Sequence, residues 1–470
     1  MVSDPSHALK AIRNALQNHK ILYLDDKYVQ ELGLSTNEIN FDIFEKIVDF
    51  CLERELTIAP HLNEKLLKMS KGNFKKMDVG IAQKLLSWDT ASSLQYLMTH
   101  YSDRFPHYYY TTKIFIEHIA RWWDIVKSRT VSFCFHSDHT QVHTEHHRIW
   151  NENYEFLDKF IDFIASVKRF PDEKAFIDWH KAAIMGTRSI LWLADNLVDK
   201  YGYKFFLPGR VLNDSIENFF SQIRGFNKNP SALMFKRFAK ALAVTQYLKY
   251  SPKGNYGEDD SEHFFIDLDD FYNNEIVKDH EEEEYDVNEI ESEGEFVLEK
   301  EDYDTNDFAE DCALANLSGY VLNKTVGHGR SKCKTCAQAF LVSEDSDDQE
   351  VNALIKAKSI KKGKLGFPSV IANKMFKSAE LLFRMKRTGL LKKNKNVGQV
   401  ILDYVLEDLA SNFEDIPKCH LKIIFGRFIR IRCHFWAKRS NQELRTAEEE
   451  EIEEHANSSA SLKQVQVTHN

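Results

Sequence analysis

Apolar residues recur at helical spacing along most of the chain. Between residues 42 and 198 they fall three and four positions apart, as at Ile43 and Ile47, which is the pattern of amphipathic helices. Similar spacing returns over about 312–445. Few segments alternate as a half-buried strand does, and residues 203–207, between Gly202 and Pro208, are the main candidate for one. The pattern predicts a mainly α protein.

Helix-start signals place three further elements. Asp4 stands at a plausible N-cap with Pro5 at the first helical position, so a helix is expected over 4–20. Two more helices are expected over 214–224 and 230–249. Breaks are expected around 327–329 and 363–368, where glycine and proline interrupt the pattern.

Charge is distributed very unevenly. The 470 residues carry a net charge of −10. Residues 257–311 hold 25 Asp and Glu against two Lys, and residues 448–454 add six more acids. Without these two segments the chain has a net charge of +19, and residues 356–395 hold 13 Lys and Arg against one acid. A basic body favours a polyanionic partner such as DNA, although a well-solvated surface has the same composition.

Composition excludes several classes of protein. The 43% of hydrophobic residues is too high for a fully disordered chain, and no collagen-like repeat is present. Seven scattered cysteines suit a reducing compartment better than a disulfide framework. No apolar run reaches the length of a membrane span. We expect a soluble intracellular protein without a membrane partner.

The segment 214–220, DSIENFF, carries two carboxylates one helical turn apart. Asp214 and Glu217 can jointly hold a divalent metal such as Mg²⁺, which prefers oxygen ligands. The same two residues also fit a capping box, with Asp214 as N-cap and Glu217 bonding back to it, and from the chemistry alone this common arrangement is favoured. Ile216 and Ile223 lie with Phe219 and Phe220 on the opposite, apolar face, which is expected to be one buried stripe.

Several segments in order resemble the P-element transposase family, including transposase-derived THAP-domain proteins. They are residues 4–14 (DPSHALKAIRN), 56–97 (with KKMDVGIAQKLLS), 122–129 (WWDIVKSR) and 213–224 (NDSIENFFSQIR). A looser match covers 312–440, through residues 317–324 followed by Cys333 and Cys336. The resemblance implies a partial, split RNase H-like α/β catalytic domain interrupted by an all-α insertion domain, plus a helical C-terminal region.

The resemblance divides the chain into six parts. They are an RNase H-like fragment (1–20), a GTP-binding-type helical insertion (21–205), an RNase H-like return segment (206–256), an acidic disordered linker (257–311), a helical C-terminal region (312–445) and a disordered tail (446–470).

The resemblance also implies catalytic carboxylates. Asp4 matches the second acid, Glu217 the third, and Asp214 the extra acid of a D-x-x-E pattern. Such acids hold two Mg²⁺ ions for strand cleavage and transfer, and Asp4 and Glu217 are the expected Mg²⁺ ligands. The first acid belongs upstream of Asp4, so the sequence as written predicts no autonomous transposase activity. A truncated product, a gene model lacking upstream exons and a domesticated remnant are the alternatives.

A GTP site is implied within the insertion. No P-loop motif is present, and the resemblance alone suggests the site. It places Lys65 and Lys76 near the phosphates, Val79 and Ser87 along the nucleotide, and Asp124 where a carboxylate accepts the guanine N1 and N2 hydrogens. The lysines also suit a solvated helix face. The sequence departs from the family pattern at residues 78 and 127, where Asp and Lys replace the usual types.

Two groups of residues suggest metal binding. Cys333 and Cys336 have the C-x-x-C spacing of zinc modules, and residues 419–420 and 433–434 are both Cys-His pairs that can supply further ligands. The second pair fits an ordinary helix equally well. Histidines also cluster at 136, 139, 143, 146 and 147. We interpret that cluster as a polar, exposed segment, because no pattern of supporting carboxylates accompanies it.

The sequence therefore indicates a nuclear, P-element-like transposase remnant that binds GTP and DNA, with a homo-oligomer as a further expectation. The alternative is a non-catalytic, domesticated nuclear protein that binds DNA or another protein. Lysine groups at 361–364 and 392–395 can act as nuclear-import signals.

Overall fold

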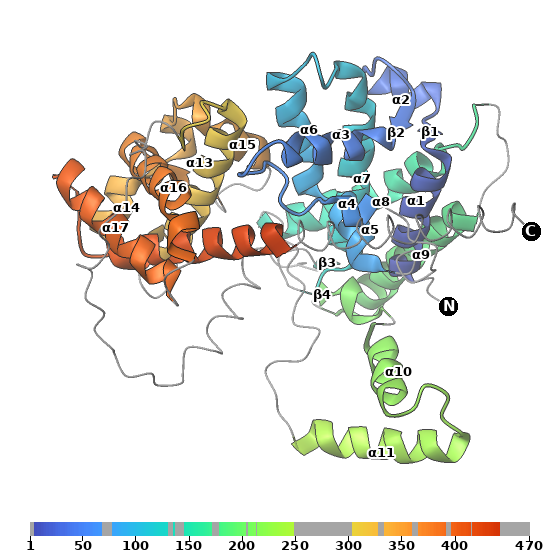
Figure 1. The fold of residues 1–470 in the computed structure, drawn as a ribbon. Helices are drawn as coiled ribbons and strands as arrows, with labels where there is room; N and C mark the ends of the chain where they lie inside the picture. The colour runs from blue at the N-terminus through green and yellow to red at the C-terminus, as the bar shows by residue number, and fades with distance from the viewer. Residues whose placement is uncertain are drawn as a thin grey trace, which may run out of the picture. The chain divides into compact units, whose positions relative to one another are not determined.

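The structure is a computed structural model, drawn as a ribbon in Figure 1. It describes residues 4–67, 78–129, 135–136, 145–171, 178–203, 205–212, 214–248, 303–327, 333–359, 365–391, 396–414 and 416–441. The chain divides into two compact units, residues 1–264 and 265–470, which we call unit 1 and unit 2.

Unit 1 is built mainly from helices. They are α1 (Pro5–His19), α2 (Asp26–Glu31), α3 (Asp42–Leu52), α4 (Glu64–Leu67), α5 (Val79–Leu85), α6 (Trp88–His100), α7 (Tyr110–Val126), α8 (Glu145–Ala165), α9 (Asp178–Ala194), α10 (Asp214–Phe226) and α11 (Ala232–Leu248). The helix predicted over 4–20 is confirmed as α1. Its N-cap is Asp4, whose Oδ1 accepts from the Ser6 N–H at 2.9 Å.

Two small antiparallel sheets complete unit 1. Strand β1 (Ile21–Tyr23) pairs with β2 (Glu38–Asn40), with Leu22 opposite Ile39. Strand β3 (Phe135–His136) pairs with β4 (Phe205–Phe206). Residues 203–207, the candidate for a strand, contain β4, which covers Phe205 and Phe206.

The core of unit 1 centres on α7, α8 and α9. Trp122 on α7 is fully buried and stacks on Phe160 of α8, with ring centroids 5.3 Å apart. The Trp122 indole N–H donates to Thr187 Oγ1 of α9 at 2.9 Å. A side chain from each of the three helices therefore meets at one buried point.

Helices α10 and α11 confirm the two helices predicted over 214–224 and 230–249. Aromatic rings join them, because Phe226 stacks on Phe238 at 5.0 Å between centroids and Phe220 packs against Phe235 at 5.8 Å. The expected buried stripe on α10 is incomplete. Ile223 is 1% exposed, whereas Phe220 is 40% exposed.

Unit 2 is also helical. Its elements are α13 (Phe308–Leu322), α14 (Lys334–Phe340), α15 (Ala353–Lys358), α16 (Val370–Leu391), α17 (Val397–Asn412), a final helix over residues 421–441, and strands β5 (Leu341–Val342) and β6 (Phe367–Pro368) paired antiparallel. The acidic linker expected to run to residue 311 ends earlier. Asp307 caps α13, and Lys377 of α16 pairs with Asp304 and Asp311, so these acids belong to the folded unit.

A buried ion network lies inside unit 2. Arg384 Nη2 donates to Glu310 Oε2 and Arg384 Nε to Glu380 Oε1, both at 2.9 Å. Arg432 binds Glu380 through two hydrogen bonds of 2.6 and 2.7 Å. All four side chains are at most 7% exposed, so charged groups join α13, α16 and the final helix.

The mainly α prediction is confirmed: all the strands described here belong to three two-stranded sheets. None of the described helices is long and apolar enough to cross a membrane.

Candidate nucleotide site and Cys/His cluster

The turn between α5 and α6 contains Ser87, one of the residues expected to line a nucleotide. Ser87 is the N-cap of α6, and its Oγ accepts from the Thr90 N–H at 3.2 Å. The Lys84 carbonyl accepts from both Ser87 Oγ at 3.0 Å and Thr90 Oγ1 at 2.9 Å. His61 Nε2 lies 2.8 Å from Thr90 Oγ1. This network fixes the start of α6.

Asp124, the expected guanine partner, lies on α7 and is half-buried. Its Oδ2 accepts from the indole Nε1 of Trp88 at 2.9 Å. Trp88 directly follows Ser87, so this bond brings two of the expected nucleotide residues onto adjoining elements. The sequence does not indicate Trp88 as a site residue, because a single tryptophan at a helix start carries no binding signal by itself.

The other expected nucleotide residues are only partly described. Val79 is the first residue of α5 and is half-buried. Lys65 lies in α4, with its side chain outside the described part, and Lys76 lies outside the described residues altogether. Asp78 caps α5 by accepting from the Gly80 N–H at 2.8 Å. The buried Arg13 lies near it, and burial lowers the pKa of Arg13 while attraction to Asp78 partly opposes this.

The structure describes the side chain of Asp4 but not those of the other expected catalytic acids, Asp214 and Glu217. The Asp4 side chain is 6% exposed, and its Oδ2 lies 2.8 Å from His7 Nδ1 while its Oδ1 caps α1. Both carboxylate oxygens of Asp4 therefore already have partners in the first turn of α1. Asp214 and Glu217 lie in α10, but their side chains are outside the described part of the chain. Their roles as catalytic and Mg²⁺-binding residues stay predictions.

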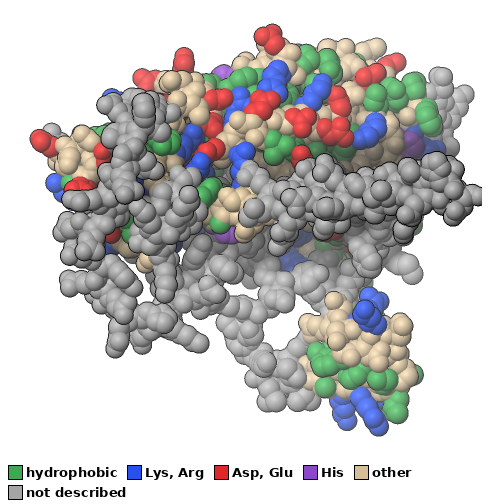
Figure 2. All heavy atoms as spheres, viewed as in Figure 1, with side chains coloured by type: hydrophobic (Ala, Val, Ile, Leu, Met, Phe, Trp, Pro, Cys, Tyr) green, Lys and Arg blue, Asp and Glu red, His purple; other side chains and the backbone are tan. Residues whose placement is uncertain are grey.

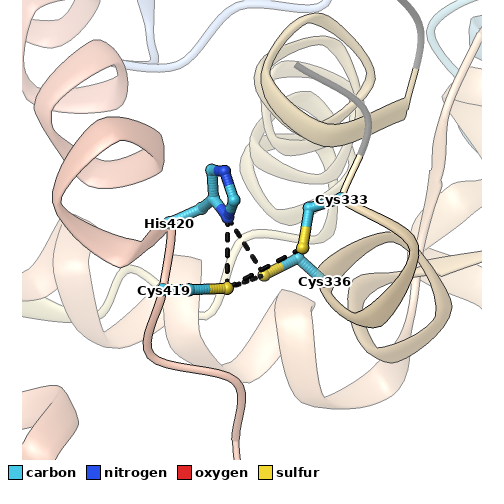
Figure 3. Close-up of side chains that lie close together, drawn as sticks. All are labelled: Cys333, Cys336, Cys419 and His420. Atoms are coloured by element: carbon cyan, nitrogen blue, oxygen red, sulfur yellow. Dashed lines mark hydrogen bonds between the residues drawn. The ribbon is translucent and has the colours of Figure 1, made fainter.

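Four sulfur and nitrogen atoms converge in unit 2 (Figure 3). Cys333 is the N-cap of α14 and Cys336 lies in its first turn, while Cys419 and His420 immediately precede the final helix. Cys419 Sγ lies 3.7 Å from Cys333 Sγ, 3.2 Å from Cys336 Sγ and 3.2 Å from His420 Nδ1. The ligand atoms of all four residues lie within 4.8 Å of one another. This arrangement can hold a metal ion.

The thiols of this cluster differ in acidity. Burial raises the pKa of Cys336 to about 12, and hydrogen bonds with Cys419 and Cys333 act in the same direction. The pKa of Cys333 is lowered, first because the Cys336 backbone N–H donates to its sulfur. Cysteines bind metals as thiolates, so a cation at this place would have to overcome the burial cost at Cys336.

The structure distinguishes the two Cys-His pairs that the sequence left open. Among the described residues, Cys333 and Cys336 lie close to Cys419 and His420. Cys433 and His434 are not part of this cluster. Cys433 lies within the final helix, where burial raises its pKa. In the other candidate cluster, His139 and His143 lie outside the described residues. The side chains of His136, His146 and His147 are likewise not described.

Comparison with known proteins connects both regions to one family. Residues 6–137 match the family model of the TNP-like, GTP-binding insertion domain, and residues 304–437 match that of the C-terminal domain of DNA transposase THAP9. The chain carries two domains of the P-element transposase family. All five expected nucleotide residues lie within the insertion-domain match, and the Cys/His cluster lies within the THAP9 C-terminal match.

One solved structure and the curated proteins complete the comparison. The Drosophila P element transposase strand transfer complex is similar with a TM-score of 0.42 and 21% identity, over 52% of this chain and 51% of that chain. The chain thus spans about half the length of that transposase chain. No curated protein matches the chain.

Proposed function

We propose that this transposase-derived protein binds GTP through its insertion domain. The match of residues 6–137 to a GTP-binding insertion domain carries the proposal. The bond between Trp88 and Asp124 supports it, because it holds a half-buried carboxylate beside the Ser87 turn. A carboxylate accepts from the N1 and N2 hydrogens of guanine, whereas adenine has no matching pair of donors on that edge.

Nucleotide preference tests the proposal. Wild-type full-length chain should bind GTP more tightly than ATP in calorimetry. Asp124→Asn replaces one acceptor oxygen by an NH₂ donor, so GTP affinity should fall about tenfold or more, and affinity for xanthosine triphosphate, whose C2 carries an acceptor, should rise.

A charge-matched variant controls for the lost negative charge. Asp158→Asn changes an exposed acid on α8 and should leave GTP affinity unchanged. Equal affinity of wild type and Asp124→Asn for GTP would contradict the assignment of the base to Asp124.

We further propose that α10 and α11 form a DNA-binding hairpin. Figure 2 shows Lys and Arg side chains beside hydrophobic ones on these helices. Five exposed basic residues contribute: Arg224, Lys228, Lys236, Arg237 and Lys240. The α11 sequence ALMFKRFAKALAVTQYL contains no acid. Such a surface binds phosphates without reading sequence.

Salt dependence tests the hairpin. Binding of the full chain to duplex DNA should weaken linearly on a log–log plot against salt concentration. Replacing Lys236, Arg237 and Lys240 by Ala should reduce the slope by about one for each phosphate that the variant no longer neutralises. A slope near zero for the wild type, or an unchanged slope in the variant, would contradict the proposal.

Derivation from a nuclear enzyme of Mg²⁺-dependent DNA strand transfer is the finer part of the proposal. Asp4, Asp214 and Glu217 are the predicted acids and Mg²⁺ is their ion, and no autonomous transposase activity is expected of the sequence as written. The non-catalytic DNA- or protein-binding alternative stays open beside it. Mg²⁺-dependent nicking of duplex DNA separates the two: activity lost in Glu217→Gln supports the enzyme, whereas DNA binding without nicking supports the alternative. The lysine groups proposed as nuclear-import signals, 361–364 and 392–395, lie outside the described residues.

A further inference from the structure

The Cys/His cluster of unit 2 has the dimensions of a tetrahedral zinc site. With Zn–S bonds of about 2.3 Å and a Zn–N bond of about 2.0 Å, a regular tetrahedron has S–S edges of about 3.8 Å and S–N edges of about 3.5 Å. The measured S–S separations from Cys419 are 3.7 and 3.2 Å. The S–N separations from His420 Nδ1 are 3.6 Å to Cys336 and 3.2 Å to Cys419.

We propose that Cys333, Cys336, Cys419 and His420 bind one structural Zn²⁺ ion. Three thiolates and one imidazole form a closed set of four protein ligands, which is the composition of structural rather than catalytic zinc sites. Soft thiolate ligands in a tetrahedral arrangement favour zinc over the hard cations Mg²⁺ and Ca²⁺.

A disulfide does not explain the cluster. The three cysteines are free thiols, and the nearest sulfurs, those of Cys336 and Cys419, lie 3.2 Å apart. A disulfide bond is about 2.05 Å long. A disulfide would need only Cys336 and Cys419. The nearby thiol of Cys333 and imidazole of His420 have no part in a disulfide, but they complete a zinc coordination shell.

The ion would join two distant parts of unit 2. Cys333 and Cys336 lie at the start of α14, and Cys419 follows Cys336 by 83 positions. His420 directly precedes the final helix, and its carbonyl accepts from the Ile424 N–H at 2.9 Å. A zinc ion therefore fixes the start of α14 against the start of the helix that carries Arg432. Because a ligand that binds only the folded state stabilises it, unit 2 should depend on this ion.

Metal content of the purified full-length chain tests the site. Wild type purified without chelator should contain about one zinc per chain by elemental mass spectrometry. Cys419→Ser should lower the zinc content at least about tenfold, because the three remaining ligands do not close the site. Cys433→Ser is the matched control, since it removes a thiol of the same unit outside the cluster, and it should keep the zinc.

Cobalt spectroscopy guards against a variant that simply fails to fold. Co²⁺ added to metal-free wild type should give the intense visible bands of tetrahedral coordination together with thiolate charge-transfer absorption. His420→Cys should restore a four-ligand site and shift these bands, whereas His420→Ala should weaken binding. Three results would each overturn the proposal. They are wild type without zinc and without tetrahedral Co²⁺ bands, equal zinc loss in Cys433→Ser, and a Cys336–Cys419 disulfide in the native protein. Because these measurements concern unit 2 alone, they are independent of GTP binding in unit 1.

Discussion

The two units satisfy buried polar groups in different ways. In unit 1, neutral hydroxyls bridge the elements: Thr111 Oγ1 donates to the Thr36 carbonyl at 2.6 Å, and Ser93 Oγ donates to the Ile58 carbonyl at 3.2 Å. Unit 2 has such bonds too, as from Ser369 Oγ to the Ala339 carbonyl at 2.8 Å, but it adds a buried ion network in which both Arg384 and Arg432 bind Glu380. A neutral hydrogen bond is worth less than a charged one, but it also costs less when one partner is removed.

The difference predicts how each unit fails. Removing one member of a buried ion network leaves an uncompensated charge in a low-dielectric core. Removing a hydroxyl leaves only an unpaired neutral group. Unit 2 should therefore be the more sensitive to single substitutions and to pH.

The largest effect is expected from Glu380→Ala. It leaves Arg384 and Arg432, 7% and 3% exposed, without their shared carboxylate. The free energy of unfolding of unit 2 should fall by about 3–5 kcal/mol. Amide hydrogen exchange read peptide by peptide separates this loss from any change in unit 1.

An exposed glutamate of the same unit is the control for Glu380. Glu407→Ala, on the solvent side of α17, should change the free energy of unfolding by less than about 0.5 kcal/mol. If both glutamate variants destabilise unit 2 equally, the buried network does not distinguish the two units.

The matching test in unit 1 is Thr187→Val, which is nearly isosteric. It removes the acceptor of the fully buried Trp122 indole N–H. The expected loss is about 1–3 kcal/mol, smaller than for Glu380 and insensitive to salt, as hydrogen exchange in α7 and α9 would show. Ser189→Ala on the same helix removes a hydroxyl bonded within one helix turn to Met185. It should change stability by less than about 0.5 kcal/mol. A salt-dependent loss in Thr187→Val would break the comparison.

Local signals in the sequence predicted local structure well. Capping chemistry predicted the start of α1 at Asp4 and Pro5, and helical spacing of apolar residues predicted α10 from Asp214. Family resemblance suggested an insertion domain over residues 21–205, and the model of the GTP-binding insertion domain matches residues 6–137. Hydrophobic spacing alone would have given helices without indicating any site.

Contacts between residues far apart in the sequence were not predictable from such local signals. Residues 419–420 and 433–434 are identical Cys-His pairs, and packing of α14 against one part of the chain decides between them. Likewise Glu380 and Arg432 look like surface charges in a basic segment, yet both are buried. The bond from Trp88 to Asp124 joins residues 36 positions apart, and no local pattern encodes it.

Trp88→Phe can be compared with Thr187→Val, the other substitution in unit 1. Trp88→Phe removes a hydrogen bond to a carboxylate, whereas Thr187→Val removes one to a neutral oxygen. Trp88 and Asp124 are both half-buried, so solvent should limit the loss to about 1 kcal/mol. GTP affinity should also fall, because Asp124 loses the donor that orients it. Trp192→Phe on α9, where Trp192 is 63% exposed, is the control and should alter neither quantity. Weakened GTP binding at unchanged stability would assign Trp88 a positioning role, whereas unchanged GTP binding would argue against one.

The smallest effect is expected from Asp304→Asn at the edge of unit 2. Burial opposes ionisation of Asp304, but hydrogen bonds from Lys377 and the Asn306 N–H outweigh it and lower its pKa. A carboxyl group with a lowered folded-state pKa adds stability above its unfolded pKa of about 3.9, and that stability is lost as the pH falls through the folded value. Near neutral pH the free energy of unfolding of wild type should therefore be higher than that of Asp304→Asn by up to about 1 kcal/mol. The difference in urea midpoint should shrink below about pH 4. A difference that persists unchanged in acid would mean that the Asp304 side chain stabilises unit 2 through packing, and the greater pH sensitivity of unit 2 would then have to come from its buried network alone.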